Sequence, residues 1–137
     1  MKRVNETKSG DCTILVMEDD YIVALDLCAH LESLGVTVIG PAAKVDDGVK
    51  LARHTSRVHG ALLDVNLSGQ VVYPVVDILS ERNIPITFVT AYDSSMLPTR
   101  YRHFRRIEKP MDPAAVSAAL SQMCPDGFSS LSTLVTD

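Results

Sequence analysis

The chain has 137 residues, 46% of them hydrophobic and 22% charged, with a formal net charge of −4 at pH 7. This length predicts a single domain, because it is too short to supply two good cores. The mild acidity argues against a nucleic-acid-binding protein, which normally presents a basic face. The apolar runs are far below the ~20 residues of a membrane span, and the polar start lacks the apolar stretch of a signal peptide. We therefore expect a cytoplasmic protein that binds neither nucleic acid nor membrane.

Apolar runs alternate with helical patterns along the chain, as is typical of a parallel sheet with crossover helices. Strands are expected at 12–17, 36–40, 60–64, 84–90 and 104–108. Helices are expected at 23–34, 45–54, 72–83, 93–103 and 112–124. This order predicts an α/β fold of the doubly wound (βα)5 type, a flavodoxin-like three-layer sandwich with a five-stranded parallel sheet. The domain covers residues 11–124, with a flexible N-terminal tail at 1–10 and a C-terminal tail at 125–137.

Local signals place several helix ends and predict one irregular helix. Asp20 and Asp112 stand where helix N-caps belong, since a short carboxylate accepts hydrogen bonds from free backbone N–H groups. Gly35 follows the first helical pattern, where a C-cap residue with a left-handed backbone is expected. Pro98 interrupts the fourth pattern, so we expect that helix to be short, displaced or frayed.

The sequence contains three cysteines, Cys12, Cys28 and Cys124. Their number is odd, and no pair has a metal-ligand spacing such as C-x-x-C. For a cytosolic protein we therefore expect buried, reduced thiols rather than a redox-active site.

Polar side chains collect at the carboxyl ends of the predicted strands. Glu18 and Asp19 follow the first strand, and Asp64 ends the third. Thr90 ends the fourth strand, and Lys109 follows the fifth. In an open parallel sheet these ends lie side by side at the ligand-binding edge. The three carboxylates would repel one another without a cation, and a cluster of few carboxylates with water ligands suits Mg²⁺.

This arrangement predicts phosphoryl chemistry at Asp64. With Mg²⁺ at the acidic cluster, the Asp64 carboxylate is positioned as a nucleophile towards a phosphoryl group and would form an acyl phosphate. Lys109 would pair with one phosphoryl oxygen, and the Thr90 hydroxyl would donate to another. The small side chain of Ala91 leaves room for the group.

Four sequence blocks carry a resemblance to a known family. They are ILVMEDD, ALLDVNLSG, ITFVTAYD and IEKPM, in this order along the chain. In order and spacing they resemble the signature blocks of the response-regulator receiver domain of two-component signalling, from Thr13 to Met123. The resemblance implies that Asp64 is the phosphoacceptor and that Thr90 and Lys109 are the switch hydroxyl and the conserved lysine. It also implies a cis bond between Lys109 and Pro110. The implied Mg²⁺ ligands are Glu18, Asp19, Asp64 and, through its main-chain carbonyl, Asn66.

The resemblance also implies partners. A sensor histidine kinase would donate the phosphoryl group, and output would pass to a histidine phosphotransfer protein or another target protein. Phe88, Thr90 and Tyr92 are similar to the Phe-x-Thr-x-Tyr pattern of stand-alone alphaproteobacterial receivers, which accompany kinases of the HWE type, some of them bacteriophytochromes. Only a short segment follows the last predicted helix, so no DNA-binding helix-turn-helix is expected. We expect a switch that loses its phosphoryl group to water, and not a turnover enzyme.

One position departs from the family pattern. Most receivers carry an aromatic residue three positions before the lysine, where this chain has Arg106. Tyr92 either replaces that residue by covering the site or merely packs at a loop edge. The basic run RYRHFRR is either a solvated face or a partner surface, so the Tyr92–Arg106 face is a candidate for homodimer contacts.

Two rival interpretations come from other classes. A receiver-like binding module that no longer uses phosphorylation is disfavoured, because all five polar residues at the strand ends are present. An aspartate-nucleophile phosphatase of the haloacid-dehalogenase type needs a second Asp two residues after the nucleophile, where this chain has Asn66. A dinucleotide-binding domain is disfavoured because no G-x-G-x-x-G turn is present.

Overall fold

The computed structural model describes residues 12–125, so the predicted tails lie outside the described residues except for Pro125. The main sheet contains β1 (Thr13–Met17), β2 (Thr37–Ala42), β3 (Gly60–Leu63), β6 (Ile86–Thr90) and β7 (Arg105–Glu108). The α-helices are α2 (Tyr21–Ser33), α3 (Val45–His54), α4 (Tyr73–Glu81) and α5 (Pro113–Met123). None of the helices in this part of the chain has the length and apolar character needed to cross a membrane.

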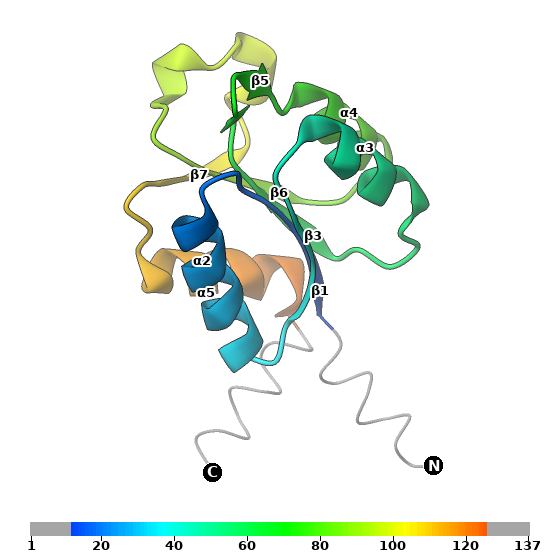
Figure 1. Cartoon of the computed structure of the whole chain (residues 1–137), viewed down its shortest axis with the longest axis vertical. Helices are drawn as coiled ribbons and strands as arrows, with labels where there is room; N and C mark the ends of the chain where they lie inside the picture. The colour runs from blue at the N-terminus through cyan, green and yellow to red at the C-terminus, as the bar shows by residue number, and fades with distance from the viewer. Residues whose placement is uncertain (1–11, 126–137) are drawn as a thin grey trace.

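The strand order is β2-β1-β3-β6-β7, and every neighbouring pair is parallel. Helices α2 and α5 cover one face of the sheet, and α3 and α4 cover the other (Figure 1). The strand order turns back between β1 and β3, which creates the edge crevice where such folds bind ligands. The predicted doubly wound, flavodoxin-like α/β fold with a five-stranded parallel sheet is confirmed.

The central strands form because their residues are apolar on both faces. Every residue of β1, β3 and β6 is buried, as expected for a parallel strand with helices on both sides. Two hydrophobic clusters result, one on each face of the sheet. Phe88 in β6 is fully buried in the cluster that α3 and α4 cover. These clusters hold the strand ends in a fixed arrangement.

The predicted helix ends are confirmed. The Asp20 carboxylate accepts hydrogen bonds from the backbone N–H groups of Ile22 and Val23 at the start of α2. Asp112 accepts from Ala114 at the start of α5 in the same way. Gly35 follows α2 with a φ of 84°, a left-handed conformation that favours glycine.

The segment 93–103, where we expected a short, displaced or frayed helix, contains no α-helix. Two short 3₁₀ turns, η1 (Ser94–Met96) and η2 (Thr99–Tyr101), occupy this segment, so the described residues contain four α-helices instead of five. Pro98 lies between the turns with an extended ψ of 147°, and its missing N–H would break a continuous helix.

A small hairpin after β3 was not predicted. It pairs β4 (Asn66–Leu67) with β5 (Gln70–Val71) in an antiparallel ladder. Its two turn residues, Ser68 and Gly69, have φ angles of 53° and 90°, as in the tight turns of two-residue hairpins. The hairpin places the Asn66–Gly69 segment beside the end of β1, where it contacts the acidic residues described below.

The prediction of three reduced thiols is also wrong. Cys12 and Cys124 form a disulfide, and Cys28 is free and half-buried. The start of β1 and the end of α5 lie at the same end of the sheet, which brings the two Cα atoms within 5.7 Å although 112 positions separate them in sequence. Spacing along the chain gives no signal of such a long-range pair.

We expect reduction of the Cys12–Cys124 bond to lower the free energy of unfolding by about 2–4 kcal/mol, because the bond restricts the unfolded chain over a long loop. Urea unfolding with and without dithiothreitol measures this difference. Cys28→Ser is the matched control and should leave the difference intact. Equal stability in both conditions would contradict a stabilising bond.

Candidate functional site

Backbone hydrogen bonds at the ends of the strands hold the site residues in place. Asp64 N–H donates to the carbonyl of Met17 at the end of β1, at 3.0 Å. Lys109 N–H donates to the carbonyl of Thr90 at the end of β6, also at 3.0 Å. The sheet pairing thus continues into the loops, and Glu18, Asp64, Thr90 and Lys109 lie at or just after the end of a strand whose register is fixed. As predicted, the Lys109–Pro110 peptide bond is cis.

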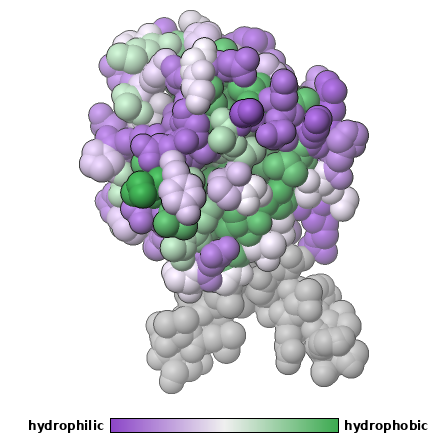
Figure 2. Space-filling model, viewed as in Figure 1, coloured by the Kyte–Doolittle hydropathy of each residue, from purple (hydrophilic) through white to green (hydrophobic). Residues whose placement is uncertain are grey.

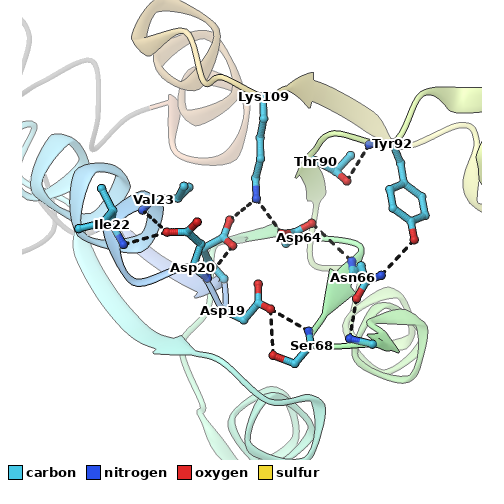
Figure 3. A network of polar contacts seen from close by, with 12 residues as sticks. Asp19, Asp20, Ile22, Val23, Asp64, Asn66, Ser68, Thr90, Tyr92 and Lys109 are labelled. Atoms are coloured by element: carbon cyan, nitrogen blue, oxygen red, sulfur yellow. Dashed lines mark hydrogen bonds and ion pairs between the residues drawn. The ribbon is translucent and has the colours of Figure 1, made fainter.

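The structure brings the predicted acidic residues and the lysine together at this edge (Figure 3). The Lys109 Nζ atom lies 2.7 Å from Glu18 Oε1 and 2.7 Å from Asp64 Oδ2. Glu18 and Asp64 are only 4% and 7% exposed. Carboxylate oxygens of Glu18, Asp19 and Asp64 all lie within 4.8 Å of one another. The ammonium therefore lies between two buried carboxylates.

Burial and ion pairing shift the pKa values in this cluster. Burial raises the pKa of Glu18, although the hydrogen bond from Lys109 opposes the shift. Burial alone would lower the pKa of Lys109, but its hydrogen bonds to Asp64 and Glu18 outweigh that effect and raise the pKa. Lys109 therefore stays charged at neutral pH, as a group that pairs with anions must.

The Ser68 turn fixes the third carboxylate. Ser68 donates from its backbone N–H and its hydroxyl to Asp19 Oδ2, at 2.8 and 2.9 Å. Burial would raise the pKa of Asp19, but these two bonds outweigh it and hold the pKa below its usual range. We had predicted no role for Ser68, and the only local signal for this contact is its place in a Ser-Gly turn four positions after Asp64.

The cluster fits a divalent cation with oxygen ligands. Three carboxylates and one ammonium leave a formal charge of −2 when all are ionised, which one Mg²⁺ would balance. The group contains no histidine or cysteine, the ligands that Zn²⁺ prefers. Asn66 lies in the hairpin directly after Asp64, and its backbone N–H approaches Asp64 Oδ1 at 3.4 Å. Glu18, Asp19 and Asp64 are thus placed to share one small, hard cation.

Replacing Glu18 by Gln should weaken Mg²⁺ binding at least about tenfold, because it removes one charge from a buried donor set. Since the raised pKa of Glu18 brings its protonation closer to neutral pH, the affinity of the unaltered protein should also fall as the pH is lowered. Isothermal titration calorimetry with MgCl₂ measures both effects. Asp20→Asn is the matched control, because the Asp20 carboxylate caps α2 and Asn caps equally well. Equal affinity in Glu18→Gln and the control would contradict the assignment.

Thr90 and Tyr92 border the cluster on its other side (Figure 3). Thr90 is buried, and its Oγ1 atom accepts a hydrogen bond from the Tyr92 N–H at 3.1 Å. The Tyr92 hydroxyl accepts from Asn66 Nδ2, also at 3.1 Å. Of the two alternatives for Tyr92, the structure shows the ring reaching the site rather than only packing at the loop edge. Arg106 donates from Nη1 to the Tyr92 carbonyl at 2.9 Å, a contact that the sequence did not suggest.

Three of the four arginines in the basic run 100–106 contact other groups of the protein. Arg100 lies 3.8 Å from Asp77, and Arg102 Nε donates to the carbonyl of Leu97 at 2.8 Å. Arg105 is exposed on β7. These contacts do not test the homodimer surface suggested for the Tyr92–Arg106 face, which stays a prediction.

Comparisons with known proteins agree with this fold. No protein-family model matches the chain. It is 38% identical over 112 residues to the phyllosphere-induced regulator PhyR of Methylorubrum extorquens, covering 80% of this chain and 42% of that protein. The chain therefore spans less than half the length of this curated relative.

Solved structures also match this chain in fold. The solution structure of SdrG from Sphingomonas melonis Fr1 matches with a TM-score of 0.72 and 30% identity, over 83% of this chain and 97% of that one. The receiver domain of a sensor histidine kinase from Pseudomonas aeruginosa PAO1 has a magnesium ion coordinated in its active-site cleft. It matches with a TM-score of 0.71 and 22% identity, over 84% of this chain and 98% of that domain. Fold, strand-end residues and relatives together show that this chain belongs to the response-regulator receiver family.

Proposed function

We propose that the protein is a signalling switch that accepts a phosphoryl group onto Asp64 with the help of Mg²⁺. The observation that carries this proposal is the Lys109 ammonium, 2.7 Å from both Glu18 and Asp64 in a buried acidic site. In this geometry the Asp64 carboxylate can act as the acceptor, and the adjacent Lys109 ammonium can pair with the incoming phosphoryl oxygens. We further propose that it acts as a switch and not as a turnover enzyme.

In the proposed reaction, Asp64 is the nucleophile. A carboxylate oxygen forms a bond to phosphorus while the bond from phosphorus to the donor's imidazole nitrogen breaks, and the electron pair stays on the imidazole. Lys109 exchanges its contact with Asp64 for one with a phosphoryl oxygen. The Thr90 hydroxyl is already oriented by the Tyr92 N–H, which occupies its oxygen and leaves its proton free to donate. Bound Mg²⁺ would supply charge neutralisation for the phosphoryl oxygens, with Glu18, Asp19, Asp64 and the Asn66 carbonyl as its proposed ligands.

The donor in this proposal is a phosphohistidine on a sensor histidine kinase, of the HWE type or a bacteriophytochrome. A histidine phosphotransfer protein or another target protein would receive the output. The similarity to PhyR and SdrG supports a regulatory partner of this class.

An exposed apolar surface beside the site supports docking of such a donor. Tyr21, Ile22 and Leu25 at the start of α2 are 74%, 62% and 53% exposed, directly after the acidic residues of the β1–α2 loop. Figure 2 shows that hydrophobic residues interrupt the polar surface on the face that carries α2. Exposed apolar surface next to a reaction site is typical of a protein contact.

Ile22→Gln should slow phosphoryl transfer from the kinase by about tenfold, the effect of losing one well-buried apolar anchor at an interface. Transfer from acetyl phosphate should be unchanged, because the small donor needs no docking surface. Met96→Gln is the matched control, since Met96 is 59% exposed on η1 and not on α2. An equal loss of transfer rate with the kinase and with acetyl phosphate would show that the substitution damages the phosphorylation site and not the docking surface.

Beryllofluoride, which mimics a phosphoryl group on a carboxylate, tests the proposed function without a partner. ¹⁹F NMR of the protein should show a bound resonance only when beryllofluoride and Mg²⁺ are both present. A bound signal that is independent of Mg²⁺ would contradict the proposed metal requirement. No bound signal in any condition would contradict phosphoryl binding and favour a phosphorylation-independent interaction module.

A further inference from the structure

Arg106 faces the loop that follows β6. Residues on β7 alternate between the two faces of the sheet, and Ile107 points into the cluster beneath α2 and α5. Arg106 therefore projects to the opposite face, where its Nη1 atom donates to the Tyr92 carbonyl at 2.9 Å. The guanidinium thus links the edge strand to the loop beside the phosphoryl-acceptor site.

Three hydrogen bonds hold Tyr92, and two of them reach the site. Its N–H donates to Thr90 Oγ1 at 3.1 Å, and its hydroxyl accepts from Asn66 Nδ2 at 3.1 Å. The third is the bond from Arg106 to its carbonyl. Thr90 ends β6, and Asn66 lies two positions after Asp64, so Tyr92 bridges the two chain segments that flank the acceptor.

The surrounding loop has little regular structure to hold Tyr92 by itself. The segment after Thr90 forms only the short turns η1 and η2 before β7. Ala91 and Asp93, the neighbours of Tyr92, are both exposed, whereas Tyr92 is half-buried. The Arg106 bond therefore ties the Tyr92 carbonyl to the edge strand β7, in addition to the bond from the Tyr92 N–H to Thr90 at the end of β6.

We propose that Arg106 is a positioning residue that, through Tyr92, controls how long a phosphoryl group stays on Asp64. This inference rests on the proposed function. Tyr92 held against Asn66 covers one side of the acceptor and keeps the Thr90 hydroxyl oriented. Loss of the phosphoryl group requires water to attack phosphorus, with cleavage of the bond to the Asp64 oxygen and release of inorganic phosphate. Freeing Tyr92 opens that side to water and speeds this step.

The chemistry of the side chain explains why arginine suits this position. A guanidinium presents several N–H donors in a rigid plane and can hold a backbone carbonyl while remaining hydrated on its outer side. A lysine has the charge but a flexible, single-point donor, and a methionine has similar length but no donor. The three side chains therefore separate the effect of the hydrogen bond from those of charge and packing.

The experiment compares Arg106→Met, Arg106→Lys and the matched control Arg105→Met, the exposed neighbour on the same strand. After acetyl phosphate is removed, the acyl phosphate of Arg106→Met should decay about fivefold faster than that of the unaltered protein, the size expected from one lost hydrogen bond. Arg106→Lys should lie between them, and Arg105→Met should match the unaltered protein. Tyr92→Phe should also decay faster, and combining it with Arg106→Met should add little.

NMR of the unphosphorylated variants provides a separate readout. The side-chain amide signals of Asn66 should shift in Arg106→Met and not in Arg105→Met, because only the first variant frees Tyr92. Unchanged Asn66 signals, or equal decay rates in Arg106→Met and the unaltered protein, would overturn the inference. If the unaltered protein takes up no phosphoryl group, the proposed function fails, and the Asn66 signals alone then decide whether Arg106 positions Tyr92.

Discussion

Replacing Asp64 by Asn should reduce phosphoryl incorporation from acetyl phosphate by at least about 100-fold, to background, because an amide oxygen cannot replace a carboxylate as nucleophile. The substitution preserves size, and Lys109, which lies 2.7 Å from Glu18 in the unaltered protein, keeps that carboxylate as a partner, so the fold should persist. Intact-mass spectrometry of the protein after incubation with acetyl phosphate and Mg²⁺ measures the incorporated group.

The control for this variant is Asp47→Asn. Asp47 is an exposed carboxylate in the first turn of α3, outside the acidic cluster. This control should incorporate phosphoryl groups as the unaltered protein does. Retained incorporation in Asp64→Asn would mean that another side chain accepts the group.

Phe88→Ala should lower the free energy of unfolding by about 3–5 kcal/mol, because it leaves a large cavity in a packed core. Phe88 is fully buried in β6, and its ring packs edge-on against Phe104 with the ring centroids 5.8 Å apart. A domain of this size is stable by only about 5–15 kcal/mol, so the loss is a large fraction of the total. The midpoint and slope of urea unfolding give the value.

Val71→Ala is the control for the stability prediction. Val71 is 46% exposed on the hairpin, and exposed substitutions normally change stability by less than about 0.5 kcal/mol. A loss of unfolding free energy below about 1 kcal/mol in Phe88→Ala would contradict the tight packing of this ring. The result also separates roles within the Phe-x-Thr-x-Tyr pattern, because Phe88 supports the core whereas Thr90 and Tyr92 contact the site.

The sequence predicted the parts of the fold that depend on local patterns. Strands such as β1 and β3 are short apolar runs, and in a parallel sheet their carboxyl ends must meet at one edge. From this rule we predicted that Glu18, Asp64 and Lys109 lie close together. The caps Asp20 and Asp112 were predictable for a similar reason, since capping depends on the residue itself and its immediate neighbours.

The parts that the sequence did not predict depend on contacts between distant segments. The Cys12–Cys124 disulfide joins residues that are 112 positions apart in sequence, and it has no local signature. The bond from Arg106 to the Tyr92 carbonyl likewise requires the edge strand and the loop to be placed first. The segment around Pro98 is irregular, as expected, but its two 3₁₀ turns and the burial of Leu97 and Tyr101 in the core depend on contacts with distant segments.

The most direct test of the central proposal locates the phosphoryl group. After incubation with acetyl phosphate, with and without Mg²⁺, borohydride reduction converts an aspartyl phosphate to homoserine, which peptide mass spectrometry identifies by position. The proposal predicts homoserine at position 64, only in samples that contained Mg²⁺. Homoserine elsewhere, or at position 64 regardless of Mg²⁺, would contradict it.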